Sequence, residues 1–275
     1  MAKFALEDFL QHTDELATIS PAVVELINKI NASSTTREEI AKLVSIDEVL
    51  YANVFKIVNS AALGLVRRPQ TVSEAIDIIG LNGLRNLVFI VAAKKVFVDL
   101  DLWYKSVFVA FSSQRIALRA GLNAQQTSDI YIAGLMQSMG ALIFKVFYKK
   151  FYEEILQIKD TDLRKVREKE IFGISSDELA YEIVKSYGLP ENIVNIIDNQ
   201  SKDWNDPGFR VENAIIKLST ALGDLDKDDI ETQSYIDDAI NFTMLTKFGI
   251  ADLNIDTEFL KALHQETNDF VRVKV

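Results

Sequence analysis

Few side chains in this sequence are suited to metal binding or nucleophilic catalysis. The chain has two histidines and no cysteine, so disulfides, cysteine nucleophiles and thiolate metal sites are excluded. His12 and His264 lie near opposite ends of the chain, and we expect each to be a surface or half-buried residue and not a metal ligand. Two histidines give no basis for a serine–histidine–aspartate triad, and no glycine-rich phosphate loop occurs. Carboxylates are abundant, but no spacing singles out a catalytic pair.

The most distinctive stretch covers residues 59–93 and predicts two helices. Thr71 and Glu74 have the spacing of a capping box, in which each side chain accepts a hydrogen bond from a free backbone N–H. Apolar residues at helical spacing lie on both sides of Gly80, and a glycine at this place is typical of a helix end. Before the first of these helices, Arg67 and Arg68 form a short basic loop.

Residues 59–93 closely resemble the signature of the HDOD family, which are bacterial signalling domains related to the HD metal-dependent phosphohydrolases. The residues that carry this resemblance are Asn59, Ser60, Ala61, Gly64, Ser73, Ala75, Ile76, Ile79, Gly80, Leu84, Arg85, Asn86 and Leu87. The resemblance extends over about residues 19–200. It implies an all-α, multi-helical HD-like fold.

HD hydrolases bind one or two metal ions through histidines and aspartates from several helices. By resemblance, Lys105 stands at a histidine position, and Gln137 and Ser138 stand at the His–Asp pair that names the fold. Ser176 stands where histidine is common, and residues 198–200 end a helix that often ends in histidines in relatives. The scaffold residues of the pattern are retained: Gly134, Gly140, Gly173, Gly188 and Pro190.

Neutral amide and hydroxyl side chains cannot hold a catalytic divalent ion, and a lysine would repel it. The resemblance therefore implies that the metal-dependent activity is lost, so we expect no metal, no cofactor and no catalytic residue.

Composition and charge narrow the class of protein. The 275 residues are 48% hydrophobic and 25% charged, which is typical of a globular chain with a large core. The net charge of −10 disfavours nucleic acid and anionic membranes as partners. The longest apolar run, residues 87–93, is far shorter than the roughly 20 residues of a membrane helix. We expect a cytoplasmic protein with no membrane contact.

Helix start signals occur along the whole chain. A helix should begin at Ser20–Pro21, and further capping boxes are predicted at Thr36/Glu39, Ser45/Glu48 and Ser175/Glu178. Residues 128–152 predict a long helix interrupted at Gly134 and Gly140. We expect an N-terminal helical subdomain (1–98) packed on an HD-like helical subdomain (99–275), of which residues 201–275 are helical by periodicity only.

The resemblance favours a non-catalytic, regulatory module for signal transduction and protein interaction, with kinases, response regulators or diguanylate cyclases as partners. One alternative is a nucleotide- or small-ligand-binding pseudo-enzyme, in which Lys105 and Gln137, with Arg115, contact a phosphate or base in the vacated pocket. A second is a DNA-binding regulator that uses a helix-turn-helix at residues 36–59. The third is an active metallophosphohydrolase.

Overall fold

A computed structural model describes residues 4–15, 21–31, 35–46, 48–59, 67–158, 160–225 and 242–273. Helices and no strand occur in these ranges, so the expected all-α fold is confirmed. The elements are α1 (Leu6–Glu15), α2 (Pro21–Asn31), α3 (Arg37–Ile46), α4 (Glu48–Val58), α5 (Val72–Val96), α6 (Leu100–Arg119), α7 (Ala124–Met136), α8 (Met139–Phe147), α9 (Lys149–Leu156), α10 (Thr161–Phe172), α11 (Ser176–Ser186), α12 (Glu191–Asp198), the 3-10 helix η2 (Asn199–Ser201), α13 (Val211–Gly223), α15 (Phe242–Lys247) and α16 (Thr257–Val271).

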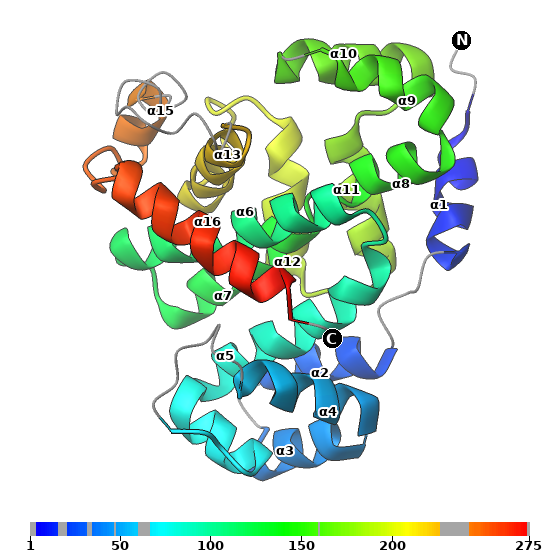
Figure 1. The fold of residues 1–275 in the computed structure, drawn as a ribbon. Helices are drawn as coiled ribbons and strands as arrows, with labels where there is room; N and C mark the ends of the chain where they lie inside the picture. Colours follow the sequence, from blue (N-terminus) through cyan, green and yellow to red (C-terminus); the bar gives the residue numbers. More distant parts are fainter. Residues whose placement is uncertain are drawn as a thin grey trace.

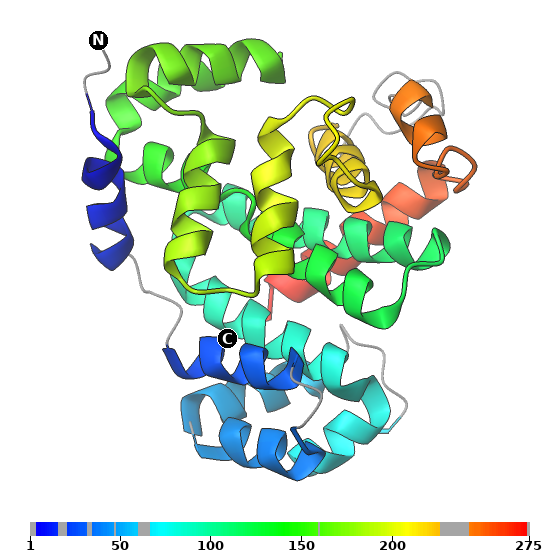
Figure 2. The same cartoon turned by 180° about the vertical axis from the view of Figure 1, so that it is seen from behind.

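The helices form two groups that meet at α5. Helices α2, α3 and α4 pack against α5 in the lower part of Figure 1, and α5 also packs against α7 of the upper group. In the upper group, α6 lies against α7, α13 and α16, and α11 lies against α8 and α12. Helix α1 runs beside α8 and α11, apart from α2, as both views show (Figures 1 and 2). The division into subdomains at residue 98 stays a prediction.

Aromatic rings hold α1 on the upper group. Phe9 of α1 contacts Phe144 of α8 edge-on, with 5.5 Å between ring centroids. Phe144 in turn stacks on Phe172 of α10 at 4.2 Å. Burial of large aromatic side chains is among the strongest contributions to packing. These rings therefore tie the start of the chain to helices more than a hundred residues later.

Capping residues fix several helix boundaries as the sequence predicts. The Thr71 hydroxyl accepts from the Glu74 N–H at 3.1 Å, and Glu74 accepts from the backbone N–H of Gln70 at 2.9 Å. Gly80 has φ of +72° and ψ of 171°, so α5 is two helical stretches joined at a bend. Only glycine adopts this conformation without strain. The boxes Thr36/Glu39 and Ser175/Glu178 are also confirmed.

Two boundary predictions are wrong. Ser45 lies inside α3 and its hydroxyl donates to the Ala41 carbonyl at 2.7 Å, so it does not cap the next helix. The stretch predicted as one helix is divided at Gln137 and Ser138, between α7 and α8, whereas Gly134 lies within α7. Three residues of the resemblance lie outside the described residues: Ser60, Ala61 and Gly64.

Gly134 and Gly140 serve close helix packing. A Cβ at Gly134 would lie 3.0 Å from the Ser113 hydroxyl of α6, and one at Gly140 would lie 2.0 Å from the Ser176 carbonyl oxygen. The second distance is far inside van der Waals contact. The missing side chain at Gly140 therefore allows α8 to approach the first turn of α11.

Two helical stretches, Val72–Val96 and Ala124–Phe147, are long and apolar enough to cross a membrane by length and composition alone. Their most apolar windows are 61% and 67% buried within the protein. The first is bent at Gly80, and the second is divided between α7 and α8. Core helices of a bundle have this composition because they are apolar on several faces.

A buried polar network joins the two helix groups. Arg85 of α5 donates to Asp129 of α7 at 2.7 Å and to the Ser128 hydroxyl at 2.9 Å. Asp129 also accepts from Gln125 and from Asn192 of α12, and Ser128 donates to Asn86. Burial raises the pKa of the Asp129 carboxyl, while Arg85 acts in the opposite direction. The network fixes how α5 meets α7 and α12.

Candidate vacated metal pocket

The four residues at the family's ligand positions line one cavity of about 710 Å³. Lys105 comes from α6, Gln137 and Ser138 from the turn between α7 and α8, and Ser176 from the first turn of α11. These positions are far apart in sequence. The fold nevertheless places them around one space, as the HD-like resemblance implies.

Lys105 pairs with a carboxylate at the C-terminal end of α13. Its Nζ lies 2.7 Å from Asp224 Oδ1. The two side chains remain 48% and 39% exposed, so water and ions screen this pair. The lysine therefore balances a nearby carboxylate at a place where the family pattern has a metal ligand.

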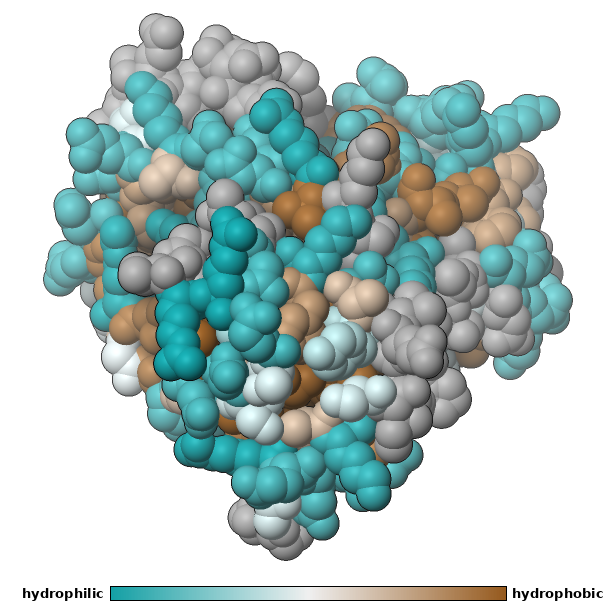
Figure 3. All heavy atoms as spheres, turned by 60° about the horizontal axis from the view of Figure 1, so that its bottom comes forward, coloured by the Kyte–Doolittle hydropathy of each residue, from teal (hydrophilic) through white to brown (hydrophobic). Residues whose placement is uncertain are grey.

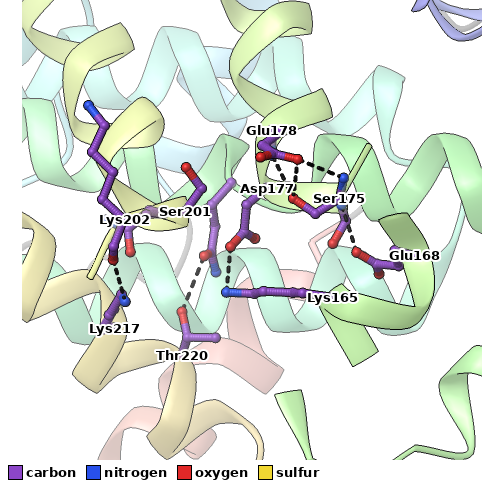
Figure 4. A network of polar contacts seen from close by, with 12 residues as sticks. Lys165, Glu168, Ser175, Asp177, Glu178, Ser201, Lys202, Lys217 and Thr220 are labelled. Carbon is purple, nitrogen blue, oxygen red and sulfur yellow. Dashed lines mark hydrogen bonds and ion pairs between the residues drawn. The ribbon is translucent and has the colours of Figure 1, made fainter. Parts of the chain in front are cut away.

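Gln137 also contacts α13. The Thr220 hydroxyl donates to Gln137 Oε1 at 3.2 Å, which Figure 4 shows as a dashed line above Thr220. Gln137 is the C-cap residue of α7, so its backbone position is set by the end of that helix. The amide is thus held by a hydroxyl from a segment beyond the predicted HDOD region.

Ser176 is held by a buried glutamate from α10. The Ser176 N–H donates to Glu168 at 2.7 Å, which is the dashed line that reaches Glu168 in Figure 4. The Tyr152 hydroxyl donates to the same carboxyl at 3.0 Å. Glu168 is fully buried. Burial raises its pKa, and the hydrogen bonds from Ser176 and Tyr152 act in the opposite direction. A carboxylate at the N-terminus of α11 is favourable for the helix dipole.

A lysine–aspartate pair crosses the cavity beside these residues. Lys165 Nζ of α10 lies 2.6 Å from Asp177 of α11, and both side chains line the cavity. Burial is the largest influence and acts to lower the pKa of Lys165, but the charge and hydrogen bond of Asp177, together with the charges of Asp162 and Glu168, outweigh it and the pKa is raised. Lys165 is therefore firmly cationic at neutral pH.

The C-terminal helix brings a histidine to the cavity that the sequence does not place there. His264 of α16 lines the cavity, and its Nδ1 lies 2.8 Å from the Tyr104 hydroxyl. Its ring stacks on Phe108 at 4.6 Å. The sequence separation of 160 residues between Tyr104 and His264 hides this contact. His12 instead stacks on Phe147 at 4.0 Å and is not among the lining residues.

Arg115 does not reach the cavity. Its guanidinium pairs with Glu266 of α16, and it is absent from the lining residues. The sequence-based suggestion that Arg115 contacts a ligand beside Lys105 and Gln137 is therefore wrong.

The residues around the cavity do not fit a divalent metal. No group of three or more histidine, aspartate or glutamate side chains able to hold a metal ion occurs in the described part of the chain. An ammonium, an amide and two hydroxyls occupy the positions at which the family carries imidazole and carboxylate. The nearby carboxylates of Asp224, Asp177 and Glu168 each accept hydrogen bonds or pair with lysines. Hard divalent ions require several free oxygen or nitrogen donors.

Two solved structures have a fold similar to that of this chain. The chain resembles a protein of Shewanella amazonensis that carries the name of a phosphohydrolase, with a TM-score of 0.75, 22% identity and 98% of each chain covered. It also resembles an HDOD domain protein of unknown function from Geobacter sulfurreducens, with a TM-score of 0.68, 21% identity and 98% and 97% covered. At these identities the likeness concerns the fold alone.

An uncharacterized protein of Treponema pallidum is 27% identical over 193 residues, which cover 67% of this chain. The chain spans 37% of the length of that relative. The sequence model of the HDOD domain matches residues 16–202, close to the expected 19–200. This match covers most of the chain and includes all four positions around the cavity. The chain therefore belongs to the HDOD domain family.

Proposed function

We propose that this chain is a signalling module that does not hydrolyse phosphoesters and that acts by binding other signalling proteins. The supporting observation is that three of the four former ligand positions have an internal partner: Lys105 with Asp224, Gln137 with Thr220, and the backbone N–H of Ser176 with Glu168. A metal pair would have to break these contacts and overcome the repulsion of Lys105. The pocket is therefore better suited to hold helices together than to activate water.

Metal analysis of the purified protein tests the loss of metal chemistry. We expect less than stoichiometric manganese, iron or zinc by mass spectrometry, and no hydrolysis of bis(p-nitrophenyl) phosphate when these ions are added. A variant that restores the family pattern, with Lys105→His, Gln137→His, Ser138→Asp and Ser176→His, should bind one metal ion or more. Stoichiometric metal together with hydrolysis by the unmodified protein would overturn the proposal.

The partners proposed by resemblance are kinases, response regulators and diguanylate cyclases, met in the cytoplasm. On the face formed by the lower part of Figure 1, hydrophilic residues predominate and hydrophobic atoms appear as separate small areas (Figure 3). Monomeric proteins rarely expose larger apolar patches unless they bind there. A partner on this face would therefore make mainly polar contacts. The basic residues Arg67 and Arg68, which precede α5, are exposed.

Affinity capture from lysate of the source organism tests this surface. The variant Arg67→Glu/Arg68→Glu is compared with Lys149→Glu/Lys150→Glu, a matched charge reversal at exposed positions of α9. We expect a signalling protein to be recovered by the wild type and by the α9 variant, and to be lost with the loop variant. Equal recovery by all three would remove the loop from the interface. Recovery of no signalling protein would contradict the proposal.

Ligand binding in the cavity is the second candidate function. A cavity of about 710 Å³ lies within the range of small-molecule sites, and Lys105 and Lys165 offer cationic groups to an anionic ligand. Nucleotides should then raise the melting temperature of the wild type but not that of Lys105→Ala. The DNA-binding alternative is supported only by the helix pair α3 and α4, and the net charge of −10 opposes it. Strongly salt-dependent DNA binding would favour it.

A further inference from the structure

A second cavity of about 570 Å³ adjoins the vacated metal pocket on the side of η2 and α13. The residues that line both cavities are Gln137, Thr161, Lys165, Asp177, Thr220 and Asp224. Three lysines line the second cavity: Lys165 from α10, Lys202 after η2, and Lys217 from α13. Four aspartates line it as well: Asp162, Asp177, Asp203 and Asp224. Two cavities with a common wall can hold a ligand whose two ends differ in chemistry.

Lys217 differs from the other two lysines. Lys165 pairs with Asp177 at 2.6 Å and Lys202 pairs with Asp198 at 2.7 Å. Lys217 Nζ donates to the backbone carbonyl of Lys202 at 3.1 Å and lies 5.2 Å from the centroid of the Phe209 ring (Figure 4 shows the first contact). Within the described ranges, no carboxylate lies within ion-pair distance of it.

The pKa of Lys217 is lowered by its surroundings although aspartates lie nearby. Burial lowers its pKa, and the nearby charge of Lys165 lowers it further, while Asp177, Asp162 and Asp203 act in the opposite direction without offsetting the first two. Lys217 is half-buried, and a partly desolvated ammonium without an ion-pair partner gains stability from an oxyanion at hydrogen-bond distance. The Thr161 hydroxyl lines the same cavity and is a suitable donor to such an anion.

We propose that the second cavity binds a small oxyanion, phosphate or a phosphate monoester, between Lys217 and Lys165. The oxyanion accepts from the two ammonium groups, and the remainder of a monoester extends across the common wall into the larger cavity. No metal ion takes part. The site shares Gln137 with the former ligand positions, but the proposal does not require that the chain bind a partner protein.

Isothermal titration calorimetry with inorganic phosphate, pyrophosphate and AMP tests the site. We expect the wild type to bind at least one of them, and Lys217→Met to weaken that binding by about tenfold or more, as for the loss of one charge-assisted hydrogen bond. Lys217→Arg should keep most of the affinity, and Lys149→Met, a remote exposed lysine of α9, should keep all of it. Tight binding of AMP but not of phosphate would identify a monoester as the ligand, and the reverse would identify free phosphate.

A second experiment uses the wild-type protein, so its result does not depend on whether a variant folds. The protein is reductively methylated with labelled formaldehyde, and the dimethyl-lysine signals are followed by NMR as pH is raised. Added phosphate or AMP should move the Lys217 titration to higher pH and leave the Lys149 titration unchanged. Wild-type affinity in Lys217→Met, binding of none of the three probes, or an unchanged Lys217 titration would each overturn the proposal. The capture experiment above would be unaffected by any of these results.

Discussion

Two polar clusters in this protein contain lysine or arginine paired with aspartate, and they differ in their access to water. Arg85 and Asp129, between α5 and α7, are 0% and 5% exposed. Lys105 and Asp224, at the vacated pocket, are 48% and 39% exposed. A buried pair is costly to break because the remaining charge has no water around it, whereas an exposed pair contributes little. The first cluster therefore fixes the arrangement of helices, whereas the second contributes little to the stability of the fold.

The largest expected effect concerns the buried cluster. Arg85→Met leaves the Asp129 carboxyl buried with the neutral amides of Gln125 and Asn192 as donors. We expect a loss of about 3–5 kcal/mol in the free energy of unfolding, measured by urea denaturation at pH 7. Arg85→Met combined with Asp129→Leu should recover part of this loss, since no unpaired charge remains. A loss below about 1 kcal/mol in the single variant would mean that the pair is not the main link between the helix groups.

Close packing at the edge of the pocket gives the next effect. Gly140→Ala places a Cβ 2.0 Å from the Ser176 carbonyl oxygen, so α8 and α11 must separate. We expect a loss of about 1–3 kcal/mol or more in the free energy of unfolding. Gly134→Ala is the matched control, because its Cβ would meet the Ser113 hydroxyl at 3.0 Å and the loss should be smaller. Equal losses in the two variants would contradict this difference in packing.

The pH dependence of stability tests whether burial raises the pKa of the Glu168 carboxyl. Its pKa is raised in the folded protein, so the folded state binds more protons than the unfolded state at a pH above about 4.5, the usual value for glutamate. Stability should therefore fall as pH rises from the unfolded-state pKa through the folded-state pKa, by about 1.4 kcal/mol for each pH unit that separates the two pKa values. Glu168→Gln removes this titration, so the difference in unfolding free energy between wild type and variant should change as pH rises from acid to neutral. A constant difference would show that Glu168 titrates as in the unfolded chain.

The smallest effect is expected at the exposed pair. Lys105→Ala should change the free energy of unfolding by about 1 kcal/mol or less, because water solvates Asp224 when the lysine is removed. Adding about 0.5 M sodium chloride should reduce the difference further. A loss as large as that of Arg85→Met would abolish the distinction between the two clusters.

Local signals in the sequence predicted helix ends, but they could not predict contacts between distant segments. Thr71 and Gly80 mark helix boundaries because the capping hydroxyl and the positive φ are properties of a few adjacent residues. Gly134 misled the prediction because its missing side chain serves packing against α6, which is a contact with another helix. Ser45 misled it because a serine hydroxyl can bond to the carbonyl four residues earlier as well as cap a helix.

The pocket was predicted in outline through the family resemblance. Lys105, Gln137, Ser138 and Ser176 were expected at one site, and they line one cavity. Asp224 and Thr220, the partners of Lys105 and Gln137, come from segments whose sequence resembles no part of the family pattern. The same holds for His264, which lies beside Tyr104 at the cavity. Arg85 was part of the signature, but its pairing with Asp129 depends on how α5 meets α7 and has no trace in either segment alone.

Residues that line the pocket lie beyond the HDOD match, and this limits where the chain can be truncated. The HDOD match ends at residue 202, but Thr220, Asp224 and His264 lie beyond it, and α13 and α16 cover α6. A fragment that stops at the family boundary would expose the buried rings of Phe108 and Phe111 and leave Lys105 without its carboxylate. We expect such a fragment to aggregate during expression, so the smallest piece that folds should reach the end of α16 at Val271.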